Sequence, residues 1–385
     1  MSDRPRRGII VFAGGGHANL YSLLRTGELV GRGFGVTLVN PSPHLYYSGM
    51  ATGVISGVYA PDEYRIDVCR LVEEGGGSFI EGRVARIRAD NKELVLETGE
   101  IVPYDAASFC LGSETSPDNF TESVARVVPV KPVEHTGQIR QRLLSLGENG
   151  APKVLVVGGG AAGCEVAANT LALLDRLGLH GRLTLAEKGE ALLADAPKKA
   201  RQEIHDFLIA KGARVLTNTL VTSFDTNAAW TRDGRRIPYD LTVMAVGVSP
   251  PSVFRTSHLP TGDDDGLWVD RHLQSIGNRH LFGGGDCVSY RGVGLPKLGV
   301  FAVRQGPVIF NNLQASLEGE PLVEYEPQRR FLYILNLGDS TGLATYGPFV
   351  WRGRLSWKLK HYIDKKFVEE HRRQQPKDVS RSRRP

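Results

Sequence analysis

The stretch KVLVVGGGAAGCEVAANTLALL, residues 153–174, places a β-type apolar run directly before a glycine-rich loop and an apolar helical pattern. Gly158 permits a tight turn, Gly160 lets backbone approach a pyrophosphate, and Gly163 lets the helix pack closely on the strand. The helix N-terminus carries a partial positive charge and unpaired N–H groups, which suit a diphosphate. The next β-type run, RLTLAE, ends in an acid, Glu187. Strand, loop, helix, second strand and terminal acid in this order predict a dinucleotide-binding unit.

Glu187 indicates which dinucleotide this unit binds. Its carboxylate can accept hydrogen bonds from both hydroxyls of an adenine ribose, and it would repel a 2′-phosphate. The residue therefore favours NADH over NADPH, although Lys188 beside it weakens this preference.

The same design occurs earlier in the chain, in IIVFAGGGHANLYSLL, residues 9–24. This copy keeps Gly14 and Gly16, but Asn19 stands where the third glycine is expected, and the second strand ends in Asn40. Asn40 can bond a ribose hydroxyl, but without charge. Such substitutions would weaken a site that must exchange NADH, and they matter less for a cofactor that is never released. We therefore predict FAD in the first site and NAD(H) in the second.

Composition limits the class of protein. The 385 residues exceed the size at which one hydrophobic core stops growing, so two or more domains are expected. The net charge of +5 is uneven: residues 351–385 hold 12 Lys/Arg against 4 Asp/Glu, so the first 350 residues carry −3. Because the basic residues belong to the C-terminal end, the body is not expected to bind nucleic acid.

The four cysteines and the hydropathy indicate the compartment. Cys69, Cys110, Cys164 and Cys287 form no CxxC or zinc pattern, so we expect no metal site and free thiols in a reducing cytosol. No stretch of about 18 residues is apolar and uncharged, so no membrane-spanning helix is expected. A cytoplasmic protein is the prediction.

Three further segments resemble the two-dinucleotide-binding-domain flavoproteins, the pyridine nucleotide-disulphide oxidoreductase superfamily. YDAASFCLGS, residues 104–113, resembles the segment that closes the first FAD half, and YDLTVMAVGVSPP, residues 239–251, resembles its counterpart after the NAD insert. HLFGGGDCVSY, residues 280–290, resembles the second FAD fingerprint, in which the residue matching Asp286 binds the ribityl chain. The loops and the resemblance together assign to FAD the residues Gly14, Gly16, His17, Ala18, Asn40, Val84, Gly112, Gly285, Asp286 and Lys297. They assign to NAD(H) the residues Gly158, Gly160, Gly163, Glu187 and Gly247.

The resemblance also implies the fold. We expect an α/β protein with two Rossmann-like dinucleotide-binding domains and a C-terminal capping region. The FAD-binding domain is discontinuous, residues 1–129 and 266–325, with the NAD(H)-binding domain inserted at residues 130–265. Residues 326–372 form an α+β cap, and residues 373–385 form a basic tail that is expected to be disordered.

Within the superfamily, the chain is most similar to type II NADH dehydrogenases and sulfide:quinone oxidoreductases. It resembles most closely the NADH dehydrogenase-like flavoprotein found fused to selenide, water dikinase, through residues 36–59, 295–313 and 347–367. This resemblance implies an FAD-dependent NADH oxidoreductase that passes two electrons through flavin to a quinone or a similar small acceptor.

The positions of the cysteines separate this activity from related ones. The helix after the first loop, residues 17–25, lacks the cysteine pair of the disulphide reductases, so a dithiol relay of that kind is excluded. Sulfide:quinone oxidoreductases need a cysteine in the C-terminal half, and none follows Cys287. Two alternatives stay open: an enzyme that oxidises a sulfur or selenium compound, and a non-catalytic flavin-based redox sensor.

The resemblance names three catalytic candidates. Glu165 matches a glutamate that reaches toward the nicotinamide carboxamide, and the alternative is a first-turn acid stabilised by the helix dipole. Lys297 opens a segment that resembles the helix whose N-terminus points at the flavin pyrimidine edge, where positive charge stabilises reduced flavin; the alternative is a surface lysine. Gln305 matches one glutamine of a quinone motif, and Phe301 replaces the other.

Three aromatic side chains have two readings each. His17 either contacts a phosphate or has a structural role. Tyr46 and Tyr47 follow NPSPH in a loop that the family places near the flavin. They either line an acceptor channel or are half-buried surface aromatics.

The segment RGRLSWKLKHYIDKKFVEEHRR, residues 352–373, has helical periodicity. Its apolar positions are Leu355, Leu359, Tyr362, Ile363 and Phe367, and the basic positions Arg354, Lys358, His361 and Lys365 lie opposite. This resembles the C-terminal membrane-surface element of the quinone reductases and predicts peripheral attachment to the cytoplasmic face of a membrane. The alternatives are a helix docked on the flavin domain or on a second subunit of a homodimer.

Overall fold

The structure is a computed structural model that describes residues 7–115, 125–179, 181–292 and 294–372. The tail at residues 373–385, which the sequence predicts to be disordered, lies outside the described residues.

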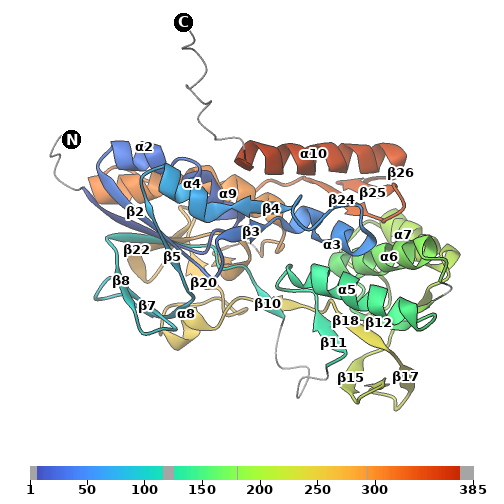
Figure 1. The fold of residues 1–385 in the computed structure, drawn as a ribbon. Coiled ribbons are helices and arrows are strands. Elements are labelled where there is room, and N and C mark those ends of the chain that lie inside the picture. The colour runs from blue at the N-terminus through green and yellow to red at the C-terminus, as the bar shows by residue number, and fades with distance from the viewer. Residues whose placement is uncertain (1–6, 116–124, 180, 293, 373–385) are drawn as a thin grey trace, which may run out of the picture.

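A large, mainly parallel sheet contains the first glycine loop (Figure 1). Its strands in the described residues are β1 (Gly8–Ala13), β2 (Phe34–Asn40), β5 (Ser78–Glu81), β9 (Ala106–Phe109), β20 (Leu267–Val269), β21 (Gln274–Ser275), β22 (Asn278–Gly283) and β23 (Val288–Tyr290). Their order is β23-β20-β21-β22-β9-β1-β2-β5, and β5, β2, β1, β9 and β22 run parallel. The helices around this sheet are α1 (His17–Leu23), α2 (Thr26–Gly31), α3 (Ser48–Ser56), α4 (Val68–Glu74), α8 (Val253–Thr256) and α9 (Gly299–Glu318).

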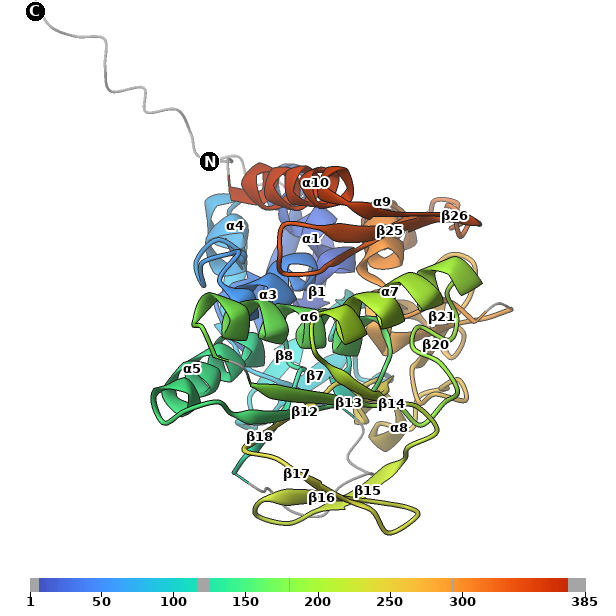
Figure 2. The ribbon, with the colours of Figure 1, turned by 90° about the vertical axis from the view of Figure 1, so that its right-hand side faces the viewer.

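A second sheet, visible at the lower centre of Figure 2, contains the second glycine loop. Its strands in the described residues are β11 (Val127–Pro129), β12 (Lys153–Val157), β13 (Arg182–Ala186), β14 (Arg214–Leu216) and β18 (Leu241–Met244). All run parallel in the order β11-β18-β12-β13-β14. Its helices are α5 (His135–Glu148), α6 (Ala161–Arg176) and α7 (Lys198–Ala210). Two parallel sheets with flanking helices confirm the predicted α/β fold with two Rossmann-like units.

Short antiparallel elements complete the described chain. They are β3 (His44–Tyr46) with β4 (Arg65–Asp67), β6 (Val84–Arg88) with β7 (Glu93–Leu96) and β8 (Ile101–Pro103), β10 (Glu114–Thr115) with β19 (Val248–Ser249), and β15 (Val221–Phe224) with β16 (Ala228–Thr231) and β17 (Arg236–Pro238). A 3-10 turn, η2 (Gly285–Cys287), precedes β23. At the C-terminal end, β24 (Leu332–Asn336), β25 (Gly342–Tyr346) and β26 (Phe349–Gly353) lead into α10 (Arg354–Arg372), which lies along one side of the molecule (Figure 1).

The division into domains stays a proposal. β11 lies just before the expected start of the inserted domain, yet it pairs with β18 of the second sheet, so we count it with that sheet. Val253 and Phe254 of α8 pack in the core of the first sheet although they precede residue 266.

Asn19 explains how the first unit folds without a third glycine. In the second unit, a Cβ added at Gly163 would lie 1.8 Å from the carbonyl oxygen of Gly158, so only glycine fits. In the first unit the fully buried Asn19 donates from Nδ2 to the carbonyl oxygen of Gly14 at 2.8 Å. Ser108 on β9 donates its hydroxyl to Asn19 Oδ1 at 2.6 Å. The amide side chain therefore replaces a close backbone contact with hydrogen bonds between helix, loop and strand.

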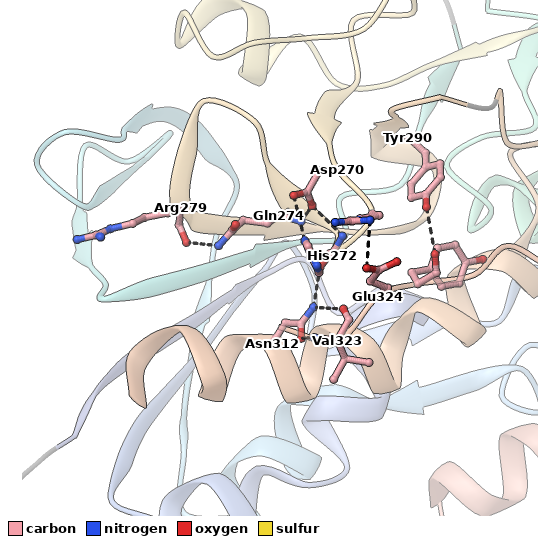
Figure 3. A network of polar contacts seen from close by, with 10 residues as sticks. Asp270, His272, Gln274, Arg279, Tyr290, Asn312, Val323 and Glu324 are labelled. Carbon is pink, nitrogen blue, oxygen red and sulfur yellow. Dashed lines mark hydrogen bonds and ion pairs between the residues drawn. The ribbon is translucent and has the colours of Figure 1, made fainter. Parts of the chain in front are cut away.

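A second polar network ties α9 to the segment that leads into the C-terminal region (Figure 3). Asn312, fully buried on α9, donates from Nδ2 to the carbonyl oxygens of His272 and Val323, each at 2.8 Å. Its Oδ1 accepts from Val323 N–H at 2.7 Å. Asp270 closes the same turn by accepting from His272 N–H at 2.8 Å and from Gln274 N–H at 3.1 Å. One side chain thus secures both the turn between β20 and β21 and the chain after α9.

Replacing Asn312 with Ala is expected to lower the free energy of unfolding by about 1–2 kcal/mol, because it removes three hydrogen bonds to partly buried backbone groups. Chemical denaturation followed by far-UV circular dichroism measures the change. Asn311→Ala is the matched control, since Asn311 is the exposed neighbour on the same helix and should change stability by less than about 0.5 kcal/mol. Equal effects of the two variants would contradict the role given to Asn312.

Candidate functional site

The two glycine loops have the same internal hydrogen bond. In the first loop, Gly15 N–H donates to Asn40 Oδ1 at 2.9 Å. In the second, Gly159 N–H donates to Glu187 Oε2 at 2.5 Å, and Gly189 N–H donates to Oε1 at 2.7 Å. The residue that ends the second strand therefore holds the middle of the loop in both units. The sequence analysis assigned Asn40 and Glu187 to ribose contacts and did not foresee this link to the loop.

The first glycine of each loop lies against a neighbouring strand end. Gly14 has a φ of +84°, and a Cβ there would lie 2.4 Å from the carbonyl oxygen of Cys110. Gly158 has a φ of +108°, and its Cβ would lie 2.3 Å from the carbonyl oxygen of Ala245. Both positions therefore require glycine for conformational and steric reasons.

Open space in front of both units fits bound nucleotides. A Cβ built at Gly160, Gly247 or Gly112 would meet no atom within 4 Å. Gly160 directly precedes α6, Gly247 follows β18, and Gly112 follows β9, so each borders the carboxyl end of its sheet. In open parallel sheets, nucleotides bind at that edge.

The two FAD fingerprints meet at Cys110. A Cβ at Gly16 would lie 2.5 Å from Cys110 Sγ, and one at Gly285 would lie 3.2 Å from the same atom. Ala18 is buried on α1 and lies against Gly284, where a Cβ would approach the Ala18 Cβ to 2.7 Å. The structure therefore brings together Gly16, Ala18 and Gly285, which the sequence analysis assigns to FAD. Val84, at the start of β6, is partly buried against the core of the first sheet.

His17 begins α1, and its ring packs beside those of Tyr47 and Phe367, with centroid separations of 5.4 and 5.8 Å, while these two rings stack on each other at 4.7 Å. Burial lowers the pKa of His17 to about 4, so the imidazole is neutral at pH 7. Its Nε2 is buried and has no hydrogen-bond partner in the described part of the chain. A buried, unsatisfied nitrogen beside the first loop fits a polar group of a bound cofactor, although a neutral ring would contact a phosphate without charge.

Asp286 is held by groups that the sequence analysis did not foresee. Lys131 Nζ lies 2.7 Å from Asp286 Oδ2, and the Ser113 hydroxyl donates to the same oxygen at 2.9 Å. Burial alone would raise the pKa of Asp286, but Lys131 and Ser113 hold it below its ordinary value. The carboxylate stays ionised and can accept hydrogen bonds from hydroxyl groups. The sequence gives no local pattern that links Lys131 to Asp286, because the two residues lie 155 positions apart.

Lys297 and Gln305 border a cavity of about 470 Å³, together with Asp286 and Phe301. Lys297 Nζ donates to the carbonyl oxygen of Asp286 at 2.7 Å and lies 2.7 Å from Asp264 Oδ2. Gln305 is buried, and its Oε1 accepts from Gly285 N–H at 2.7 Å. Both side chains therefore support the turn that carries Asp286.

Glu165 lies on α6, which begins at Ala161 and has no acid in its first turn, so the first-turn alternative is wrong. Its Oε1 accepts from Asn336 N–H on β24 at 2.6 Å. Burial raises the pKa of Glu165 to about 7, and Lys360 on α10 partly opposes this shift. A carboxyl group of this kind exchanges its proton near neutral pH.

Lys360 and Asp364 form a polar stripe on α10 that lies beside Glu165 and that the sequence does not predict. Lys360 Nζ lies 3.0 Å from Asp364 Oδ2 and donates to the carbonyl oxygen of Gly49 at 2.8 Å. Asp364 Oδ1 accepts from the Tyr47 hydroxyl at 3.0 Å. Tyr47 thus faces this interior cluster. The i,i+4 spacing of Lys360 and Asp364 in the sequence could have predicted that these two side chains pair on one face of the helix.

α10 turns four of its five predicted apolar side chains outward. Leu355 is 79% exposed and Tyr362 63%, and Leu359 and Ile363 are also exposed. Phe367 instead packs inward against His17 and Tyr47, and Ser356, Asp364 and Val368 are buried. The helix does dock on the body of the chain, as one alternative proposed, through Phe367, Val368 and its polar residues. The four outward apolar side chains stay exposed within the described residues.

A profile of the pyridine nucleotide-disulphide oxidoreductase family matches residues 9–306. One relative is the demethylphylloquinone reductase NdbB of Synechocystis, 29% identical over 90% of this chain and 87% of the relative. Among solved structures, the sulfide:quinone oxidoreductase of Aquifex aeolicus superposes with a TM-score of 0.82 at 15% identity, over 94% of this chain and 91% of that one. NDH2 of Plasmodium falciparum in complex with NADH superposes with a TM-score of 0.81 at 15% identity, over 94% of this chain and 96% of that one.

At such identities the two structures support the fold alone, and they agree with the two-unit architecture described above. The family profile spans more than half of the chain and includes both glycine loops and the Asp286 fingerprint. FAD and NAD(H) are the cofactors typical of proteins with this profile, and the residues present fit both. The chain belongs to the pyridine nucleotide-disulphide oxidoreductase family, as its motifs predict.

Proposed function

We propose that this protein is an FAD-dependent NADH oxidoreductase that delivers two electrons to a quinone. FAD, when bound, stores two electrons between NADH and the acceptor. Residues of the first loop, Asp286 and Lys297 would hold it, and the second loop with Glu187 would hold NADH. The name of the Synechocystis relative supports a quinone as acceptor.

One observation carries the proposal: a carboxyl group that titrates near neutral pH lies where the NAD helix meets the C-terminal region. NADH supplies a hydride, and a quinone needs one further proton to become a quinol. Glu165 is partly buried, and its pKa of about 7 allows it both to hold and to release a proton at neutral pH. The same α10 that carries Lys360 also contacts His17 of the first loop through Phe367, so this junction adjoins both units.

The thiols argue against a sulfur or selenium substrate. Burial raises the pKa of Cys110 to about 11, and it raises the pKa of Cys164 and Cys287 further. All three are therefore protonated and poorly nucleophilic at pH 7. Cys69 lies on α4, and a pKa of about 11, raised mainly by burial, makes it equally unreactive.

Anaerobic titration with NADH is expected to bleach the visible flavin absorbance of the purified protein at one equivalent per flavin. Addition of a soluble quinone should then restore the flavin absorbance at a rate at least as fast as steady-state turnover. Bleaching by sulfide but not by NADH would overturn the proposal. A long-lived reduced state that no acceptor reoxidises would favour the redox sensor.

Glu187→Ala is expected to raise the KM for NADH about tenfold and to reduce the preference for NADH over NADPH. The reason is that it removes the charged group that would accept hydrogen bonds from the ribose hydroxyls. Glu187→Gln loses the charge but keeps one oxygen that can accept from one of the two loop N–H groups, so it should damage the loop less than Glu187→Ala does. Glu190→Ala, an exposed acid nearby, is the control. Steady-state kinetics with both nucleotides measure the effect, and unchanged constants in Glu187→Ala would exclude the ribose role.

We further infer that the outer face of α10 and β26 rests on an anionic membrane surface. Phe349, Leu355 and Tyr362 are each more than 60% exposed, and Arg354 and Lys358 are exposed on the same helix. Each basic residue near an anionic leaflet contributes about 1 kcal/mol. The attachment we propose is peripheral and on the cytoplasmic face of the membrane. No described helix is long and apolar enough to cross a bilayer.

Leu355→Asp combined with Tyr362→Asp is expected to weaken binding to phosphatidylglycerol-containing vesicles about tenfold or more, because two apolar anchors are lost. Co-sedimentation measures the effect, with the exposed Ile101→Asp on β8 as control. If the face instead binds a second copy, the wild type will elute as a dimer, the double variant as a monomer, and neither will bind vesicles.

A further inference from the structure

Three ionisable side chains, one basic and two acidic, meet beneath α10. Lys360 is 11% exposed and Asp364 5%, and Glu165 faces them from α6. One ammonium group can balance only one of the two carboxyl groups. Removing an uncompensated charge from water is costly, so one carboxyl group is expected to keep its proton.

The geometry decides which carboxyl group is charged. Among the ion pairs of the described residues, Lys360 pairs with Asp364, at 3.0 Å, and no pair joins Lys360 to Glu165. Tyr47 donates a hydrogen bond to the other oxygen of Asp364 at 3.0 Å. Glu165 Oε1 accepts from the backbone N–H of Asn336, which is an uncharged donor. Asp364 therefore has the contacts of a carboxylate, and Glu165 is left as the group that carries the proton.

We propose that Asp364 is a positioning residue that keeps Glu165 protonated by holding the Lys360 ammonium group away from it. The proposal rests on the function proposed above and adds a residue on a different helix that controls its proton supply. In the balanced reaction, NADH gives a hydride, Glu165 gives one proton to the reduced acceptor, and bulk water returns a proton to Glu165.

The other groups around Glu165 do not titrate near pH 7. Burial raises the pKa of Tyr59 and Tyr333, which face Glu165, so both hydroxyls stay protonated. Burial lowers the pKa of His361, which stacks on Tyr59, so that ring is neutral. Burial tends to lower the pKa of Lys360, but Asp364 and Glu165 raise it above its ordinary value, so the ammonium group persists. Burial also raises the pKa of Cys164, the neighbour of Glu165 on α6, so its thiol stays neutral. Burial also raises the pKa of Asp364, while Lys360 and the Tyr47 hydrogen bond oppose this shift. The proton of this cluster is therefore divided between the two carboxyl groups.

Asp364→Asn tests the proposal, because it frees the Lys360 ammonium group to stabilise an ionised Glu165. An infrared pH titration measures the protonated carboxyl band of Glu165, assigned by its loss in Glu165→Gln. The midpoint is expected near pH 7 in the wild type and lower by about one pH unit or more in Asp364→Asn. Asp364→Glu should restore it, and an unchanged midpoint in Asp364→Asn would overturn the proposal.

Two further variants secure the interpretation. Tyr47→Phe removes one hydrogen bond that stabilises the ionised form of Asp364. The Glu165 midpoint should therefore move in the same direction by a smaller amount. This variant keeps the test available if Asp364→Asn fails to fold. Glu370→Gln is the matched control, since Glu370 lies 3.7 Å from Lys366 in an exposed i,i+4 pair on the same helix. A shift of equal size in Glu370→Gln, or none in Tyr47→Phe, would count against Asp364.

Stopped-flow measurements separate this proposal from the proposed function. In the wild type, reoxidation of the reduced protein by a soluble quinone should slow as pH rises through about 7, and this midpoint should move down in Asp364→Asn. Failure of NADH to bleach the flavin at any pH would refute the oxidoreductase function. Normal bleaching with an unmoved reoxidation midpoint would refute only the role of Asp364.

Discussion

The architecture depends on a close backbone contact that occurs twice. The first glycine of each loop lies against the carbonyl oxygen of the residue that follows a neighbouring strand, Cys110 for Gly14 and Ala245 for Gly158. A side chain at either glycine would collide with that carbonyl and push the loop from the sheet edge. The contact fixes where each helix begins, and therefore where its unpaired N–H groups point. Both nucleotide sites follow from this constraint.

The two units then diverge in how the helix is held to the strand. The second unit uses the absence of a side chain at Gly163, and the first uses the amide of Asn19, hydrogen-bonded to Gly14 and Ser108. A buried amide with its donor and acceptor both satisfied specifies one geometry. Such a rigid first loop suits a cofactor that stays bound, whereas the charged Glu187 in the second unit suits one that exchanges.

The C-terminal helix joins the two units through aromatic and polar contacts. α10 places Phe367 on the His17 ring of the first loop and Lys360 and Asp364 beside Glu165 of the second. Its apolar side chains Leu355 and Tyr362 face outward. An amphipathic helix that buries its polar stripe reverses the usual arrangement. The function proposed above uses the interior charges, and the outward side chains form the surface that we propose rests on a membrane.

Sequence alone determined the two strand–loop–helix units and the family, because these depend on residues a few positions apart, and it predicts FAD in the first unit and NAD(H) in the second. It also placed the amphipathic helix near residues 354–372. Only the tertiary structure decided which side of that helix faces inward, because a hydrophobic pattern does not reveal whether the protein or another surface covers it. The pairing of Asp364 with Lys360 opposite Glu165 likewise needs contacts between α6 and α10, which lie far apart in the chain. Lys131 at Asp286 and Gly159 at Glu187 are cases of the same kind, since long-range hydrogen bonds leave no local pattern.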